Sequence, residues 1–119
     1  MTAHSEIRLS PTAEGVVVLQ LVGDHDMATA PDLEAHLAVA VAEGAGIVID
    51  LFDTTFMDST VIRTLFRCHE ELEQRGRRLV LHIRTDSPLA RVLEISTLGD
   101  TVPCVPIREE AVRLAAQTE

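Results

Sequence analysis

The chain alternates between short segments that are almost wholly apolar and longer segments in which apolar residues recur every three or four positions. The short segments are rich in valine, isoleucine and leucine, which predicts strands. Three consecutive apolar residues at 47–49 indicate a strand that is buried on both faces. We place strands at residues 7–9, 16–22, 47–52 and 79–83, with a weaker edge strand at 102–107 that contains two prolines.

Helical spacing predicts four further elements, and the first two carry clear apolar stripes. The first stripe contains Leu33, Leu37 and Val41, and the second contains Ile62, Leu65, His69 and Leu72. Thr29 and Pro31 suit the start of the first helix, and a glycine follows each of the first two helices. We place helices at about 31–43, 59–75, 88–95 and 109–116. Because strands alternate with helices, we predict an α/β sheet with parallel pairs and right-handed crossovers.

Composition narrows the function of this domain. The chain has 119 residues, enough for one core, and a net charge of −9 with no lysine among its basic residues. An acidic balance disfavours nucleic-acid binding, because contacts to phosphates supply most of that affinity. No apolar run approaches the roughly 18 residues of a membrane span, and the first residues lack the pattern of a signal peptide. We therefore expect a cytoplasmic protein with no membrane span and no direct nucleic-acid contact.

The common enzyme signatures are missing from the sequence. Neither the glycine-rich dinucleotide fingerprint nor the P-loop motif occurs. Asp50 and Asp53 near a strand end give a superficial likeness to response-regulator receivers, but those domains also need a lysine beside the phosphorylated residue. Because no convergent catalytic group can be identified, we expect a protein that is not an enzyme and needs no cofactor.

Several reactive side chains have a simpler structural interpretation. Residues 24–26 are Asp-His-Asp, but neighbouring side chains of an extended segment point to opposite faces, so we expect a solvated loop rather than a metal site. Cys68 and Cys104 lack zinc spacing, and we expect each to be a small buried apolar residue. His69 lies on an apolar helix stripe, which predicts a hydrogen-bonded core or boundary residue.

The most informative segment, residues 50–62, places a strand end, a short loop and a helix start in series. Either Asp58 or Ser59 is well suited to cap the helix that follows. Capping explains only one of these two residues, and it does not explain the apolar pair Phe56 and Met57 before them. That pair could anchor the loop in the manner of a hydrophobic staple.

This segment resembles the signature of STAS domains, the family of anti-sigma factor antagonists. The family pattern has a strand, Asp-Leu, a short spacer, an aromatic residue, an apolar residue and Asp-Ser-Ser/Thr. The matching residues here are Asp50, Leu51, Phe56, Met57, Asp58, Ser59 and Thr60. Residues 23–31 resemble an early turn of the family, and a late helix is matched by Pro88, Val92, Leu93 and Leu98.

The resemblance covers about residues 5–117 of a single domain, 1–119, and implies the STAS fold. That fold has a mixed sheet of four to five strands, with about four helices packed mainly on one face. Three residues depart from the family pattern. Val61 replaces a glycine, which we expect to hinder close approach of a partner backbone. Asp53 adds a charge to the spacer, and His25 replaces an apolar residue in the early turn.

The resemblance also implies a mechanism. The unphosphorylated protein would bind an anti-sigma factor that is also a serine kinase of the histidine-kinase-like ATPase fold, and this would release a sigma factor. The kinase would then phosphorylate Ser59, with Thr60 as the alternative acceptor, and a PP2C-type phosphatase would reverse the reaction. The expected partner surface contains Asp24, Asp26, Thr29, Phe56, Met57, Asp58, Ser59, Thr60, Ile62 and Arg63.

Simple electrostatics is consistent with such a switch. A phosphoserine carries about −1.5 to −2 charges, which a helix N-terminus tolerates, so the fold should survive the modification. We expect Asp53 and Asp58 to repel the phosphate, and a partner would have to desolvate it. Two other functions stay open: a scaffold of the same fold in a stress-signalling complex or lipid-transport system, and a small enzyme.

Overall fold

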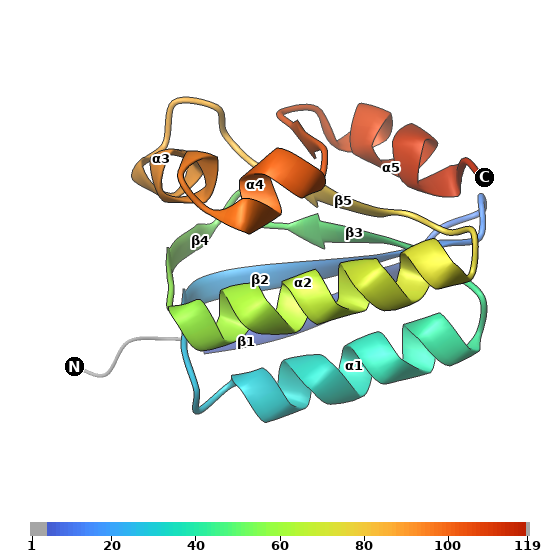
Figure 1. Cartoon of the computed structure of the whole chain (residues 1–119), viewed down its shortest axis with the longest axis horizontal. Coiled ribbons are helices and arrows are strands. Elements are labelled where there is room, and N and C mark those ends of the chain that lie inside the picture. Colours follow the sequence, from blue (N-terminus) through green and yellow to red (C-terminus); the bar gives the residue numbers. More distant parts are fainter. Residues whose placement is uncertain (1–4, 119) are drawn as a thin grey trace.

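The computed structural model describes residues 5–118, which form a mixed sheet and five helices (Figure 1). The strands are β1 (Ser5–Pro11), β2 (Val16–His25), β3 (Gly46–Asp50), β4 (Thr54–Met57), β5 (Leu79–His82) and β6 (Cys104–Val105). The helices are α1 (Ala30–Ala42), α2 (Ser59–Gln74), α3 (Pro88–Glu94), α4 (Thr97–Thr101) and α5 (Arg108–Ala116). None of these helices combines the length and the apolar character that crossing a bilayer requires.

The main path of the sheet has the order β1-β2-β3-β5-β6. β1 is antiparallel to β2, whereas β2, β3, β5 and β6 are parallel, which confirms the predicted parallel pairs. β4 pairs with the last part of β2, after a register shift between Gly23 and Asp24. Gly23 has a φ of 83°, a conformation that favours glycine. The prediction of a loop at 54–57 was wrong, because pairing with the end of β2 makes this short segment a strand.

The sheet is buried on both faces, and each face has its own core. Alternate residues of β2, β3 and β5 face α1 and α2, which lie side by side (Figure 1), and α3 and α4 add to the same core. The opposite face is smaller and packs against α5 through Val16, Val18, Val48, Val80, Ala111 and Ala115. Four helices therefore lie on one side of the sheet and α5 lies on the other. This arrangement confirms the prediction that the helices pack mainly on one face.

The helix limits follow the sequence signals closely. Thr29 is the N-cap residue of α1, and the glycines that follow α1 and α2, Gly44 and Gly76, have positive φ. The sequence pattern missed α4, which follows α3 after a short break and begins at the capping residue Ser96. Its apolar content is too small to be recognised, because the one buried residue of this helix is Leu98.

The two cysteines lie in different environments. Cys68 lies on α2 and is buried in the main core, as predicted. The prediction for Cys104 was wrong, because this residue lies on the two-residue edge strand β6 and is exposed. Burial raises the pKa of the Cys68 thiol to about 12, and partial enclosure of the Cys104 thiol also raises its pKa. Both thiols are therefore poor nucleophiles at neutral pH.

Candidate functional site

The N-terminus of α2 is held by Asp58, which connects it to the turn after β2. The backbone of Asp58 is extended, and its Oδ1 accepts a hydrogen bond from the Val61 N–H at 3.1 Å. Its Oδ2 accepts from the Met27 N–H at 3.2 Å, and its own N–H donates to the His25 carbonyl at 3.2 Å. Asp58 rather than Ser59 is therefore the cap, and it joins two segments that are about thirty residues apart in sequence.

Ser59 is the first residue of α2, and its side chain is exposed. Thr60, the alternative acceptor, is half-buried, which agrees with its expected lower accessibility. The hydroxyls of Ser87 and Ser96 have a different role, because they accept hydrogen bonds from the backbone of α3 and α4 as helix caps. At α2 the preceding aspartate performs this task, so Ser59 differs from the two capping serines.

Two exposed apolar residues belong to the segments next to the Asp58-Ser59 pair: Met27, whose N–H bonds to Asp58, and Phe56, three residues before Ser59. Met27 is 71% exposed and Phe56 is 50% exposed, whereas Met57 is buried in the core. The prediction that Phe56 and Met57 both anchor the loop was therefore right for Met57 only. Their opposite placement follows from β4, because successive side chains of a strand point to opposite faces. The exposed pair provides apolar area that a partner could cover.

The polar residues of the turn are bonded mainly to one another. Asp26 Oδ1 accepts from the Ala28 N–H at 2.9 Å, and the Asp26 N–H donates to Thr29 Oγ1 at 3.2 Å. Asp24 Oδ1 accepts a hydrogen bond from the Thr55 hydroxyl on β4. His25 is 1% exposed, so the prediction of a solvated loop was wrong for this residue. Its burial is possible because hydrogen-bond partners for both ring nitrogens lie close by.

The next residues of α2 divide between the core and the surface. Val61 is fully buried and packs in the main core, Ile62 is half-buried against it, and Arg63 is exposed. The expected obstruction of a partner by Val61 was therefore wrong, because its side chain faces inward. The valine side chain therefore contributes to the core of the protein and not to the outer surface of α2.

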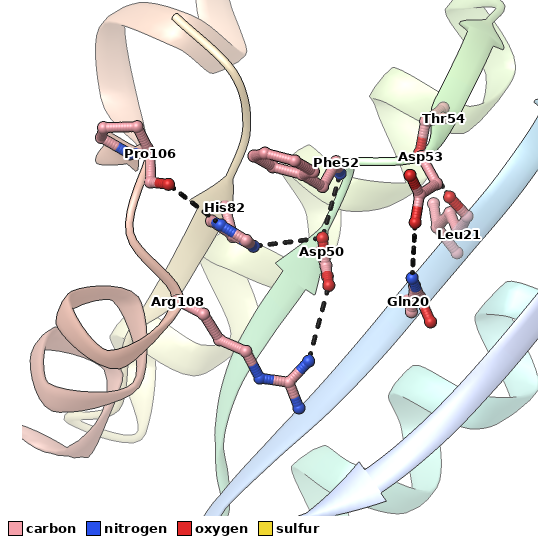
Figure 2. A network of polar contacts seen from close by, with 9 residues as sticks. All are labelled: Gln20, Leu21, Asp50, Phe52, Asp53, Thr54, His82, Pro106 and Arg108. Atoms are coloured by element: carbon pink, nitrogen blue, oxygen red, sulfur yellow. Dashed lines mark hydrogen bonds and ion pairs between the residues drawn. The ribbon is translucent and has the colours of Figure 1, made fainter.

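Asp53 lies away from this site. Its Oδ2 accepts from Gln20 Nε2 at 3.1 Å, and Figure 2 shows this pair beside the end of β3. Five residue-to-residue steps lead from Asp53 to Asp58, mostly along β4, and an extended chain covers about 16 Å in five steps of roughly 3.3 Å each. That distance exceeds the Debye length of about 8 Å at physiological ionic strength. We therefore expect Asp53 to repel a phosphate on Ser59 only weakly, whereas Asp58 is the direct neighbour of Ser59 in the chain.

A second polar cluster, which the sequence analysis missed, lies at the ends of β3 and β5 (Figure 2). His82 Nδ1 is 3.1 Å from Asp50 Oδ1, and His82 Nε2 is 3.2 Å from the Pro106 carbonyl. Asp50 also accepts from the Phe52 N–H at 3.0 Å and lies 3.7 Å from the Arg108 guanidinium. The cluster thereby fastens the start of α5 to the sheet.

The position of this cluster could have been foreseen in part. Asp50 and His82 each end an apolar strand segment, and they are direct partners in the β3–β5 ladder. Both lie on the sheet face that α5 covers, because they are two residues after Val48 and Val80. The proline carbonyl and the arginine come from a segment whose approach no local pattern predicts. This cluster belongs to the packing of α5 and does not contact Ser59.

Comparisons with known proteins agree with this geometry. The STAS domain family matches residues 9–111. The anti-sigma-B factor antagonist of Listeria monocytogenes is 36% identical over 83 residues, which are 69% of this chain and 72% of that protein. The anti-sigma-B factor antagonist of Listeria innocua matches to the same extent.

Solved structures give the same result for the fold. The crystal structure of an anti-sigma factor antagonist from Mycobacterium paratuberculosis has a TM-score of 0.81 at 26% identity and covers 96% of both chains. The phosphorylated form of the Bacillus cell fate determinant SpoIIAA has a TM-score of 0.71 at 27% identity, over 91% of this chain and 97% of that one. By sequence and by fold, the chain belongs to the STAS domain family of anti-sigma factor antagonists and has the SpoIIAA-like fold.

Proposed function

We propose that this domain binds an anti-sigma factor while Ser59 is unphosphorylated, and that phosphorylation of Ser59 ends the interaction. The anti-sigma factor would also be the serine kinase, an ATPase of the histidine-kinase-like fold, and its capture would release a sigma factor. A PP2C-type phosphatase would restore the binding form. The proposal is supported by the relatives above, one of which has been solved in a phosphorylated form.

The observation that carries the proposal is the division of tasks between Asp58 and Ser59. Asp58 supplies the helix cap and the link to the turn, so modification of the exposed Ser59 leaves both of these contacts in place. The first N–H groups of α2 and the helix dipole favour a negative charge at this position. A phosphate on Ser59 should therefore change the surface without unfolding the domain.

The effect on binding follows from the surroundings of Ser59. Met27 and Phe56 are exposed apolar residues of the neighbouring segments, and a partner that covers both together with Ser59 must exclude water from this region. A phosphoserine would then have to lose its hydration, which costs several kcal/mol unless the partner supplies cations. Asp58 adds a negative charge immediately before the phosphate and strengthens the effect. Binding and phosphorylation are therefore mutually exclusive in this scheme.

The proposed contact surface lies around this helix start. Its outer members are exposed or half-buried, whereas Met57 supports the surface from inside the core. Asp24 and Asp26 give the turn side of the surface an acidic character, which favours a partner with basic groups at the rim. The proposed surface contains Asp24, Asp26, Thr29, Phe56, Met57, Asp58, Ser59, Thr60, Ile62 and Arg63.

Incubation with ATP and candidate kinases from the same genome, followed by mass spectrometry, tests the acceptor. We expect a single phosphate on Ser59, none in Ser59→Ala, and an unchanged yield in Thr60→Ala. Ser87→Ala is a matched control, because Ser87 also lies at a helix start but is occupied in capping. A phosphate on Thr60 or on Ser87 in place of Ser59 would contradict the assignment.

Pull-down with the kinase that modifies the domain tests the consequence for binding. We expect Ser59→Ala to bind at all ATP concentrations and Ser59→Glu to bind at least about tenfold more weakly, a factor that corresponds to roughly 1.4 kcal/mol. Circular dichroism should give the same unfolding temperature for both variants within about 2 °C, because surface changes have small effects on stability. Equal binding of all forms would refute the switch.

A further inference from the structure

His25 lies under the turn that faces Ser59, at the last position of β2. Its imidazole is almost completely buried, and its two ring nitrogens contact the strand before the turn and the last residue of the turn. Nε2 lies 3.0 Å from the Val22 carbonyl, and Nδ1 lies 3.1 Å from Thr29 Oγ1. The ring therefore spans the turn from the strand that enters it to the residue that caps α1.

The partners of the ring define its tautomer. A carbonyl oxygen can only accept, so Nε2 carries a hydrogen that it donates to Val22. Thr29 Oγ1 accepts from the Asp26 N–H at 3.2 Å and has its own hydrogen to give to Nδ1 or to the Asp26 carbonyl. The Thr29 hydroxyl therefore connects the ring of His25 to the backbone N–H and carbonyl of Asp26.

The same short segment provides both contacts that Asp58 makes with the turn. The His25 carbonyl accepts from the Asp58 N–H, and the Met27 N–H donates to Asp58 Oδ2. The direction of the Met27 N–H depends on the conformation of this segment, because Met27 is the second residue of the turn that the hydrogen bond from the Thr29 N–H to the Asp26 carbonyl closes. A side chain that holds this turn in one conformation therefore also holds Asp58, the residue before Ser59, in place.

We propose that His25 is a positioning residue of the Ser59 switch: its imidazole holds the turn in the shape that aims the Met27 N–H at Asp58. This inference rests on the proposed function of Ser59. An apolar side chain could fill the same space but could not bond to Val22 or Thr29. The STAS pattern has an apolar residue at this position, so the fold does not depend on the imidazole. Histidine adds an ordered turn beside the acceptor serine.

Amide exchange with solvent, measured by NMR on the whole domain, tests the positioning without any partner. In His25→Leu we expect the Met27 and Asp58 amides to exchange about tenfold faster, the change that the loss of roughly one hydrogen bond gives. The amides of β3 should keep their protection. His25→Gln should restore slow exchange, because its amide group has both a donor and an acceptor. His69→Leu is the control, since it removes a half-buried histidine from the middle of α2.

Phosphorylation kinetics then connect the turn to the switch. With a kinase that modifies the wild-type domain, we expect His25→Leu to raise KM several-fold at unchanged kcat, and His25→Gln to restore KM. Unchanged exchange at Met27 and Asp58 in His25→Leu would overturn the proposal, and so would faster exchange spread evenly over β2 and β3. If no kinase modifies Ser59, the proposed function fails, whereas the exchange data still decide whether His25 orders the turn.

Discussion

Asp58 makes one hydrogen bond through each carboxylate oxygen, so two substitutions can separate its two tasks. Asp58→Ala removes both the helix cap at Val61 and the contact with Met27. Asp58→Asn keeps one oxygen, which can still cap α2, because asparagine is as good an N-cap residue as aspartate. Its amide nitrogen cannot accept from the Met27 N–H, so that contact alone is lost.

The expected magnitudes follow from these two contacts. Loss of an N-cap side chain costs about 1 kcal/mol, within a range of roughly 0.5 to 2. Loss of the second hydrogen bond costs about 1 kcal/mol more. We therefore expect the free energy of unfolding to fall by about 2 kcal/mol in Asp58→Ala and by about 1 kcal/mol in Asp58→Asn. For a domain of this size, these values correspond to decreases in Tm of about 8 °C and 4 °C.

Urea denaturation followed by circular dichroism measures both free energies under identical conditions. Asp86→Ala is the matched control, because it removes an exposed aspartate from a loop and should change the stability by less than about 0.5 kcal/mol. Equal losses in the alanine and asparagine variants would refute the assignment of one contact to each oxygen. A loss no larger than that of the control would refute the role of Asp58 as a cap.

Two further predictions concern packing and thiol chemistry. A Cβ on Gly46 would lie 2.0 Å from the Ala115 carbonyl oxygen, so Gly46→Ala must displace α5 and should lower the free energy of unfolding by about 3 kcal/mol in urea denaturation. In the control variant Gly44→Ala the new Cβ meets nothing within 4 Å, and the positive φ of this residue should cost about 1 kcal/mol. Equal losses in the two variants would contradict the close packing of α5 on Gly46. At pH 8 a chromogenic disulfide reagent should modify Cys104 slowly and leave Cys68 unmodified until urea is added, because burial raises the pKa of Cys68 to about 12. Equally fast reaction of both thiols in the native protein would contradict their different burial.

Hydrophobic patterning predicted the parts of the fold that are buried over several residues. The strand around Val48 and the stripe of α2 could be recognised because their apolar residues repeat with the period of one element. β4 and α4 have four and five residues, too short for a period to be visible. β4 depends on the end of β2, which is about thirty residues away in sequence, whereas α4 packs against the adjacent α3 and against α2.

The candidate site was predicted in its residues but less well in their roles. The Asp58-Ser59 pair could be placed at a helix start, but the choice of Asp58 as cap depends on its second partner, Met27. His25 was expected in solvent, because the acceptors that allow its burial come together only when the turn forms. The prediction that the Val61 side chain faces a partner was wrong for a similar reason. The family pattern has a glycine at this position, and a glycine does not show which side of α2 packs against the core.

The two contacts of Asp58 also affect how related sequences should be compared. In a chain that keeps this turn, an aspartate that caps α2 and contacts the turn stabilises the fold whether or not the next residue is ever phosphorylated. Substitution should therefore be slow at position 58 even in lineages where position 59 has drifted to another residue. The aspartate of an Asp-Ser pair then reports on the structure of the turn, and the evidence for a phosphorylation switch must come from the serine and from the exposed surface around it.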